Sequence, residues 1–80
     1  MNRKSRMKYR QFTAIIEREG DWYVALSPEL DIASQGQSVE EARRNLIEAI
    51  SLFLEMASPA EIQERMHSEV FVTQVGVPVA

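Results

Sequence analysis

The sequence predicts an α+β domain, in which a small antiparallel three-stranded sheet is covered on one face by a long amphipathic helix. Apolar and polar residues alternate with a period of two over residues 7–19 and 22–26, which is typical of half-buried strands. Residues 38–57 instead place apolar residues at spacings of three and four, which is typical of an amphipathic helix. A further strand expected over residues 69–77 completes the order β-β-β-α-α-β.

The first two strands are expected to form a hairpin. The alternating residues 7–19 end in Glu19-Gly20-Asp21, which is a tight-turn sequence. A second alternating run begins at once with Trp22 and ends at Leu26. Two such runs separated by so short a gap are the pattern of a β-hairpin.

The third strand is expected to be short. Ser27-Pro28 ends the second strand, because proline donates no hydrogen bond to a neighbouring strand. Residues 28–31 are expected to form a loop, residues 32–35 the third strand, and Gly36 the turn that ends it.

Two helices are indicated by capping sequences. Ser38 is a good N-cap, and Glu41 three residues later completes a capping box. Pro59 ends this helix, and Ser58-Pro59-Ala60-Glu61 repeats the capping pattern. A second, short helix is therefore expected to run to about Met66.

The last expected strand covers residues 69–77, where apolar residues alternate again before Pro78. Two placements are open. The strand can join its own sheet, with the helix as the crossover to a parallel neighbour, or it can pair with another subunit.

The composition is that of one small globular domain. The chain has 80 residues, of which 45% are hydrophobic and 26% charged, with no cysteine and the single histidine His67. These counts exclude a disulfide framework, a cysteine nucleophile and a zinc site built on several histidines, and no cofactor is expected. Without a covalent staple, so small a chain is expected to oligomerise. No stretch approaches the roughly 20 apolar residues of a membrane span, so a soluble, cytoplasmic protein is expected.

The net charge of −3 is unevenly distributed. Residues 1–10 form a basic N-terminal arm without acidic residues, and residues 11–80, the single domain, hold four basic residues against 12 acidic ones, a balance of −8. Such an acidic body suits a basic partner. The basic arm is the candidate for nucleic-acid contact, although chain ends are often simply solvated. Its basic residues are Arg3, Lys4, Arg6, Lys8 and Arg10.

Catalysis has less support in the sequence. Asp21, Glu29 and Asp31 lie in expected loops, and converging carboxylates can bind Mg²⁺ for phosphodiester cleavage. Acidic residues are also common in turns, where they make local hydrogen bonds. His67 has no evident orienting partner. We therefore assign no catalytic residue and no metal ligand, and a metal-dependent nuclease stays an alternative.

Several stretches together resemble the HicB-like antitoxin family. They are Tyr23-Val24-Ala25-Leu26-Ser27-Pro28-Glu29-Leu30, Gln35-Gly36-Gln37-Ser38-Val39-Glu40-Glu41-Ala42, and residues 45–50 and 52–55. The usual family pattern is a strand, a Pro-Glu-Leu loop, a glycine turn with Ser or Thr, and Glu-Glu-Ala opening a helix. The resemblance covers residues 12–57. It departs from the pattern at Asp31-Ile32-Ala33, where many members carry Pro-Gly-Cys.

The resemblance implies a partial ribonuclease H-like fold without the catalytic acids, and a role as antitoxin of a type II toxin–antitoxin pair. The implied partner is a small, basic HicA-type toxin that cleaves messenger RNA and is neutralised by occlusion. Many members also carry a C-terminal DNA-binding domain, for which the residues after Ala57 are too few. We expect a binding protein without enzymatic activity, forming a homo-oligomer (dimer or tetramer). The expected partner-facing residues are Trp22, Tyr23, Glu29 and Asp31.

Overall fold

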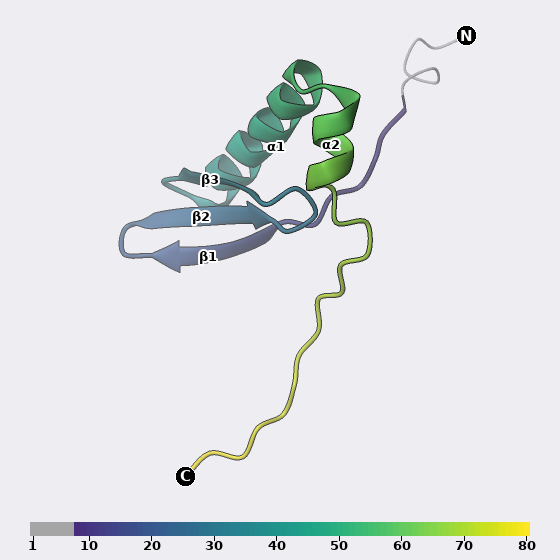
Figure 1. The fold of residues 1–80 in the computed structure, drawn as a ribbon. Helices are drawn as coiled ribbons and strands as arrows, with labels where there is room; N and C mark the ends of the chain where they lie inside the picture. The colour runs from purple at the N-terminus through teal and green to yellow at the C-terminus, as the bar shows by residue number, and fades with distance from the viewer. Residues whose placement is uncertain (1–7) are drawn as a thin grey trace, which may run out of the picture.

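The computed structural model describes residues 8–80 and has the predicted α+β architecture (Figure 1). Arg3, Lys4 and Arg6 of the basic arm lie outside the described residues. The elements in chain order are β1 (Ile15–Glu19), β2 (Trp22–Ser27), β3 (Ile32–Gly36), α1 (Val39–Met56) and α2 (Pro59–Arg65). Neither helix combines the length and the apolar character needed to cross a bilayer, a statement that covers residues 8–80.

The three strands form an antiparallel meander in the order β1-β2-β3. In the first hairpin, Ile15 pairs with Leu26 and Glu19 with Trp22. Gly20 occupies the first central position of the turn with a φ of 61°, which glycine adopts without steric cost. The predicted hairpin is therefore confirmed, with the glycine where a two-residue turn requires it.

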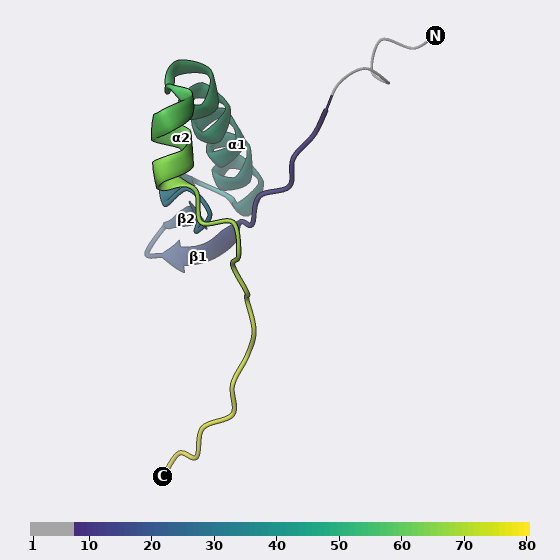
Figure 2. The same ribbon diagram turned by 45° about the vertical axis from the view of Figure 1, so that its right-hand side comes forward.

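Helix α1 covers one face of the sheet and lies over β3 and β2 far more than over β1 (Figures 1 and 2). Neighbouring residues of a strand face opposite sides, so Tyr23, Ala25 and Ser27 of β2 face the helix while Trp22, Val24 and Leu26 face away. The core between the two layers is small. Its buried apolar side chains are Ala25, Leu30, Ala42, Leu46 and Ile50.

The start of α1 lies directly against the end of β3. Ser38 caps the helix, because its hydroxyl accepts a hydrogen bond from the Glu41 amide at 3.0 Å. The Glu41 carboxylate accepts from the Gln37 amide at 3.1 Å, so the cap reaches one residue further back than a standard capping box. A Cβ on Gly36 would lie 2.5 Å from the Ala42 nitrogen. Gly36 is needed for this close approach, whereas the sequence suggested only a turn.

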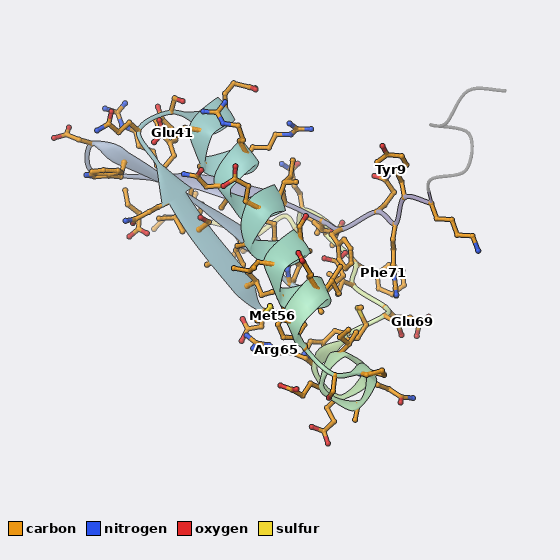
Figure 3. All side chains as sticks on the ribbon, turned by 90° about the horizontal axis from the view of Figure 1, so that it is seen from above. Tyr9, Glu41, Met56, Arg65, Glu69 and Phe71 are labelled. Atoms are coloured by element: carbon orange, nitrogen blue, oxygen red, sulfur yellow. The ribbon has the colours of Figure 1, made fainter. Side chains whose placement is uncertain are left out.

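Helix α2 begins with the predicted capping box of Ser58 and Glu61. Near its end, Arg65 donates from Nε to the Leu30 carbonyl at 2.9 Å and from Nη2 to the Asp31 carbonyl at 3.1 Å. The Arg65 guanidinium also lies 5.2 Å from the ring centroid of Phe53. Figure 3 shows Arg65 near Met56, at the opposite end of α1 from Glu41. The loop between β2 and β3 is thereby held to the helical layer.

The first strand is shorter than the predicted residues 7–19. Pairing begins only at Ile15, opposite Leu26, and residues 8–14 lead into β1 without strand structure. A strand needs a hydrogen-bonded neighbour, and β2 ends at Ser27, before Pro28. The alternating sequence before Ile15 therefore lacks a strand to pair with in this sheet.

The expected strand over residues 69–77 is not formed in the single chain, since residues 66–80 belong to no helix or strand. The His67 amide donates to the Glu29 carbonyl at 2.7 Å, and residues 68–80 then run away from the sheet (Figures 1 and 2). We call residues 68–80 the C-terminal arm. Apart from the half-buried Val70, its apolar side chains are open to solvent, with Phe71 86% and Val79 91% exposed.

Candidate functional site

The face of the sheet that points away from α1 forms the first candidate surface. Figures 1 and 2 place both helices on the opposite face. Three cross-strand pairs of β1 and β2 make up this surface, and we call it the hairpin face: Ile15 with Leu26, Glu17 with Val24, and Glu19 with Trp22. Directly opposed residues of an antiparallel pair lie on the same face with their side chains in contact range.

The hairpin face combines an aromatic side chain with carboxylates. Trp22 is 44% exposed, and its cross-strand neighbour Glu19 and its chain neighbour Asp21 are both exposed. Arg18 points to the other face, where its guanidinium lies 6.0 Å from the Tyr23 ring centroid and its Nε donates to the Gly20 carbonyl. The face therefore offers an apolar strip bordered by negative charge, which suits a partner that is both basic and apolar.

Two of the residues predicted to face a partner, Trp22 and Tyr23, lie on opposite sides of the sheet. Trp22 is on the hairpin face. Tyr23 is half-buried and packs against the core under α1. Only Trp22 is therefore available to a partner that binds the hairpin face.

Glu29 makes its contacts within the chain. Its carboxylate accepts hydrogen bonds from the Thr13 amide at 2.9 and 3.0 Å, from the Thr13 hydroxyl at 2.6 Å and from the buried Ser27 hydroxyl at 3.1 Å. Burial raises the pKa of Glu29, but these hydrogen bonds and one from its own amide outweigh burial and leave the pKa below its ordinary value. The charged carboxylate thus holds the β2–β3 loop to the segment before β1.

Asp31 ends the same loop. It is exposed and adopts a φ of 54°, in the left-handed region, while its carbonyl accepts from Arg65. Glu29 and Asp31 follow the end of β2, whereas Trp22 opens it, and a six-residue strand spans about 20 Å. The structure therefore does not bring the four predicted residues into one surface.

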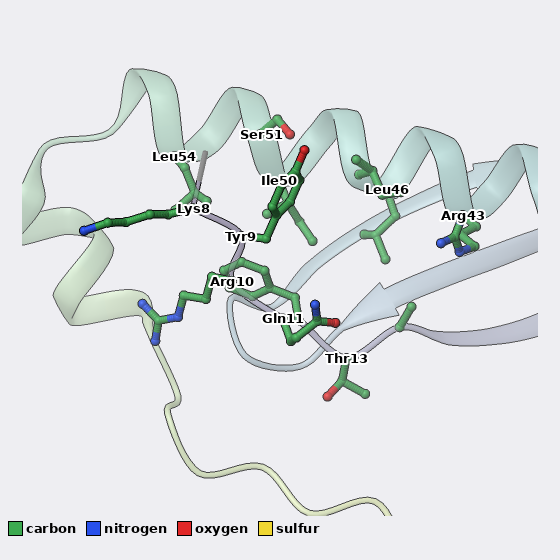
Figure 4. A pocket seen from close by; sticks show the side chains of 13 residues that line it. Lys8, Tyr9, Arg10, Gln11, Thr13, Arg43, Leu46, Ile50, Ser51 and Leu54 are labelled. Carbon is green, nitrogen blue, oxygen red and sulfur yellow. The ribbon is translucent and has the colours of Figure 1, made fainter. Parts of the chain in front are cut away.

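A groove beside residues 8–14, the segment that leads into β1, is the second candidate surface. We call it the β1 groove; it has a volume of about 620 Å³ and lies between residues 8–14 and one side of α1 (Figure 4). Leu46, Ile50 and Leu54 of α1 project toward residues 8–14. The groove has three basic lining residues, Lys8, Arg10 and Arg43, and no acidic one.

Sequence reasoning missed the β1 groove. The signal that marks it is the width of the apolar stripe on α1, which includes Ile47 as well as Leu46 and Ile50. Ile47 is 50% exposed because α1 lies over β3 and β2 and leaves its β1 side uncovered. When the apolar stripe of a helix is wider than the part that its sheet covers, the remaining apolar side chains indicate a second contact surface.

The acidic residues considered for a nuclease do not converge. Within residues 8–80, no group of three or more His, Cys, Asp or Glu side chains is arranged to hold a metal ion. Asp21 lies in the hairpin turn and Glu29 beyond the far end of β2. The single histidine contributes its backbone amide to the fold.

Comparison of the chain with protein-family models, with curated protein sequences and with solved structures found no match. Its function is therefore inferred from the surfaces described above.

Proposed function

We propose that this chain is a protein-binding module without enzymatic activity, acting as the antitoxin of a type II toxin–antitoxin pair. Its partner would be a small, basic HicA-type toxin that cleaves messenger RNA. The observation that supports this proposal is the hairpin face, where the exposed Trp22 lies among the carboxylates of Glu17, Glu19 and Asp21 on a sheet surface without a helix.

Binding at the hairpin face would combine two effects. A tryptophan supplies a large apolar contact, and such anchors contribute strongly to binding at the centre of interfaces. The three carboxylates would attract a basic RNA-binding surface and compete with the phosphates of its substrate. Covering that surface blocks cleavage without any chemical step. Because messenger RNA is the toxin's substrate, the pair would act in the cytoplasm.

The residues behind the family resemblance have structural roles that fit the proposed fold. Glu29 and Leu30 of the Pro-Glu-Leu loop are hydrogen-bonded or buried, Gly36 allows α1 to approach β3, and Ser38 caps α1. A three-stranded meander followed by a helix packed on it supports our proposal of a partial ribonuclease H-like arrangement. The residues that carry the family resemblance would therefore stabilise the fold, and the hairpin face would contact the toxin.

The test is co-expression of the chain with the small open reading frame beside its gene. We expect a stable complex in which the neighbour's ribonuclease activity is silenced. Trp22→Ala should weaken the complex by about 2 kcal/mol, or roughly 30-fold. Glu17→Lys with Glu19→Lys should weaken it further, and should also reduce the dependence of the association rate on salt.

The matched control is Leu52→Ala on α1, where the side chain is 60% exposed and lies outside the hairpin face. This variant should bind as the wild type does. If no small basic protein is encoded nearby, if none binds, or if Trp22→Ala and the double lysine variant bind as tightly as the wild type, the antitoxin proposal fails.

Nucleic-acid binding is the second candidate function, and the observation that favours it is the meeting of Lys8, Arg10 and Arg43 around the β1 groove. Contacts to phosphates would make binding strongly salt-dependent. Each phosphate contact removed by Lys8→Ala or Arg10→Ala should flatten the slope of log K against log salt by about 0.7 to 0.9. An unchanged slope would exclude these residues from the interface.

A further inference from the structure

We propose that the C-terminal arm of one chain lies extended in the β1 groove of a second copy and reaches the free edge of β1 as an additional strand, and that two copies exchange arms in this way. The inference is independent of the antitoxin proposal, because the hairpin face takes no part in it. The proposal explains three features at once: the exposed apolar side chains of the C-terminal arm, the unfilled β1 groove and the free outer edge of β1.

The arm has the properties of a strand without a neighbour. It is extended, and apolar residues occupy most of residues 70–79. Phe71, Val75 and Val77 are each more than two thirds exposed, and Figure 3 shows Glu69 and Phe71 on the chain beyond α2. Unpaired extended backbone with exposed apolar side chains is a template for pairing with another chain.

The β1 groove has room and a backbone edge for such a strand. β1 has only β2 as a neighbour, so its outer edge is free within the described part of the chain. The groove ends where β1 begins, since it is lined by residues 8–14 and by no residue of β1 itself. An arm laid in the groove and along β1 would extend the sheet and bring its apolar side chains against Ile47, which the sheet leaves half exposed.

The charges of the two surfaces are complementary. Glu69 is the only charged side chain in residues 68–80. The groove is lined by Lys8, Arg10 and Arg43 and by no acidic residue. An arm entering the groove would therefore bring one carboxylate to a basic site and otherwise add apolar contact.

The direction of the arm favours a second copy over the arm's own groove. The arm starts at His67, whose amide is hydrogen-bonded to the Glu29 carbonyl, and both ribbon views show it running away from the sheet (Figures 1 and 2). Filling its own groove would require the chain to reverse at this point. Thirteen extended residues reach about 45 Å, which is enough to cross to a neighbour.

Reciprocal exchange also supplies the area that a small chain needs. In a two-fold dimer each arm fills the other copy's groove, so every contact is made twice. Because specific interfaces bury roughly 1,200 Å² or more, a contact made twice favours a stable dimer over a contact made once.

The first test measures mass by sedimentation or light scattering across micromolar concentrations. The wild-type chain should be a dimer, and Ile47→Asp in the groove and Phe71→Asp in the arm should each make it monomeric. Both side chains are exposed in the single chain, so neither variant should disturb its helical circular dichroism. Leu52→Asp, on α1 but outside the groove, is the control and should remain dimeric.

The second test uses the absence of cysteine from the sequence. Two variants are prepared, a tagged chain with Ile47→Cys and an untagged chain with Val72→Cys. They are mixed in the unfolded state, refolded together and treated with a flexible bismaleimide. We expect a crosslink between the two chains, and none when Leu52→Cys replaces Ile47→Cys. The double variant Ile47→Cys with Val72→Cys tests the other placement, because an arm in its own groove would be crosslinked within one chain.

Three results would overturn the inference. They are a monomeric wild-type chain, a dimer that survives both aspartate substitutions, and crosslinking confined to single chains. If the chain is monomeric alone but Ile47 becomes protected when the basic partner is added, the groove belongs to that partner and the arm-exchange proposal is wrong.

Discussion

The Glu29 carboxylate accepts hydrogen bonds from both the backbone amide and the hydroxyl of Thr13, 16 residues earlier in the chain. The same carboxylate accepts from the Ser27 hydroxyl, which is fully buried. One side chain therefore joins the segment before β1, the end of β2 and the loop to β3. This explains why an acidic residue in a surface loop contributes to the fold.

Glu29→Gln should lower the free energy of unfolding by about 1 to 2 kcal/mol at pH 7. Glutamine keeps one acceptor oxygen but turns an amide donor toward the donors of Thr13 and Ser27. Urea denaturation measures the loss. Glu64→Gln, an exposed position on α2, is the control and should change little.

The same substitution should change the pH dependence of stability. Since the folded-state pKa of Glu29 is lowered, its contribution is fully present above the unfolded-state pKa of about 4.3 and is lost as pH falls through the folded value. The wild type should therefore lose more stability in acid than Glu29→Gln does. Denaturation curves from pH 7 to pH 3 should converge; a constant gap would contradict this role.

Gly36→Ala should destabilise the domain by about 1 to 3 kcal/mol, the usual range for overpacking. The new methyl group would lie 2.5 Å from the Ala42 nitrogen, so the first turn of α1 would have to move off β3. Gly76→Ala is the control, with both variants measured in the Ile47→Asp chain where arm exchange is removed, because nothing in its own chain lies within 4 Å of a Cβ there. Thermal unfolding of both variants distinguishes steric contact from a general effect of replacing glycine.

Ser38→Ala should cost about 1 kcal/mol, because the Glu41 amide loses its cap at the start of α1. Glu48→Ala replaces an exposed residue in the interior of the same helix, outside the β1 groove, and should change stability little, since alanine has a high helix propensity. Equal losses for the two variants in chemical denaturation would show that the cap contributes nothing.

Arg65→Ala should release α2 from the loop between β2 and β3. The substitution removes two hydrogen bonds to the Leu30 and Asp31 carbonyls and the contact with the Phe53 ring. Amide hydrogen exchange should accelerate throughout α2 while α1 stays protected. Arg65→Lys should not restore protection, because an ammonium group cannot reproduce the two-pronged contact; full protection in the lysine variant would mean that charge alone is sufficient.

The elements with strong local signals could be predicted from the sequence. The hairpin at Gly20, the caps at Ser38 and Ser58 and the start of each helix depend on residues within a few positions of one another. The physical causes are also local. The turn needs a residue that adopts a left-handed conformation, and the first amides of a helix need hydrogen-bond acceptors.

Features that depend on distant neighbours could not be predicted. Glu29 has the sequence signature of an exposed loop acid, and only the approach of Thr13 gives it a structural role. The alternation of residues 69–77 predicts a strand, but a strand also needs a partner, which the single chain does not provide. The opposite faces of Trp22 and Tyr23, by contrast, follow from the alternation of residues 22–26, and grouping the two in one partner-facing surface was wrong.

The contacts of Arg65 also have a consequence for synthesis on the ribosome. They join residues 34 and 35 positions apart, so the β2–β3 loop stays without them until α2 has been translated. The contacts between β1 and β2 are much nearer in sequence, so the hairpin can form before the contacts of α2 are available. Arm exchange, which needs residues 68–80, would come last.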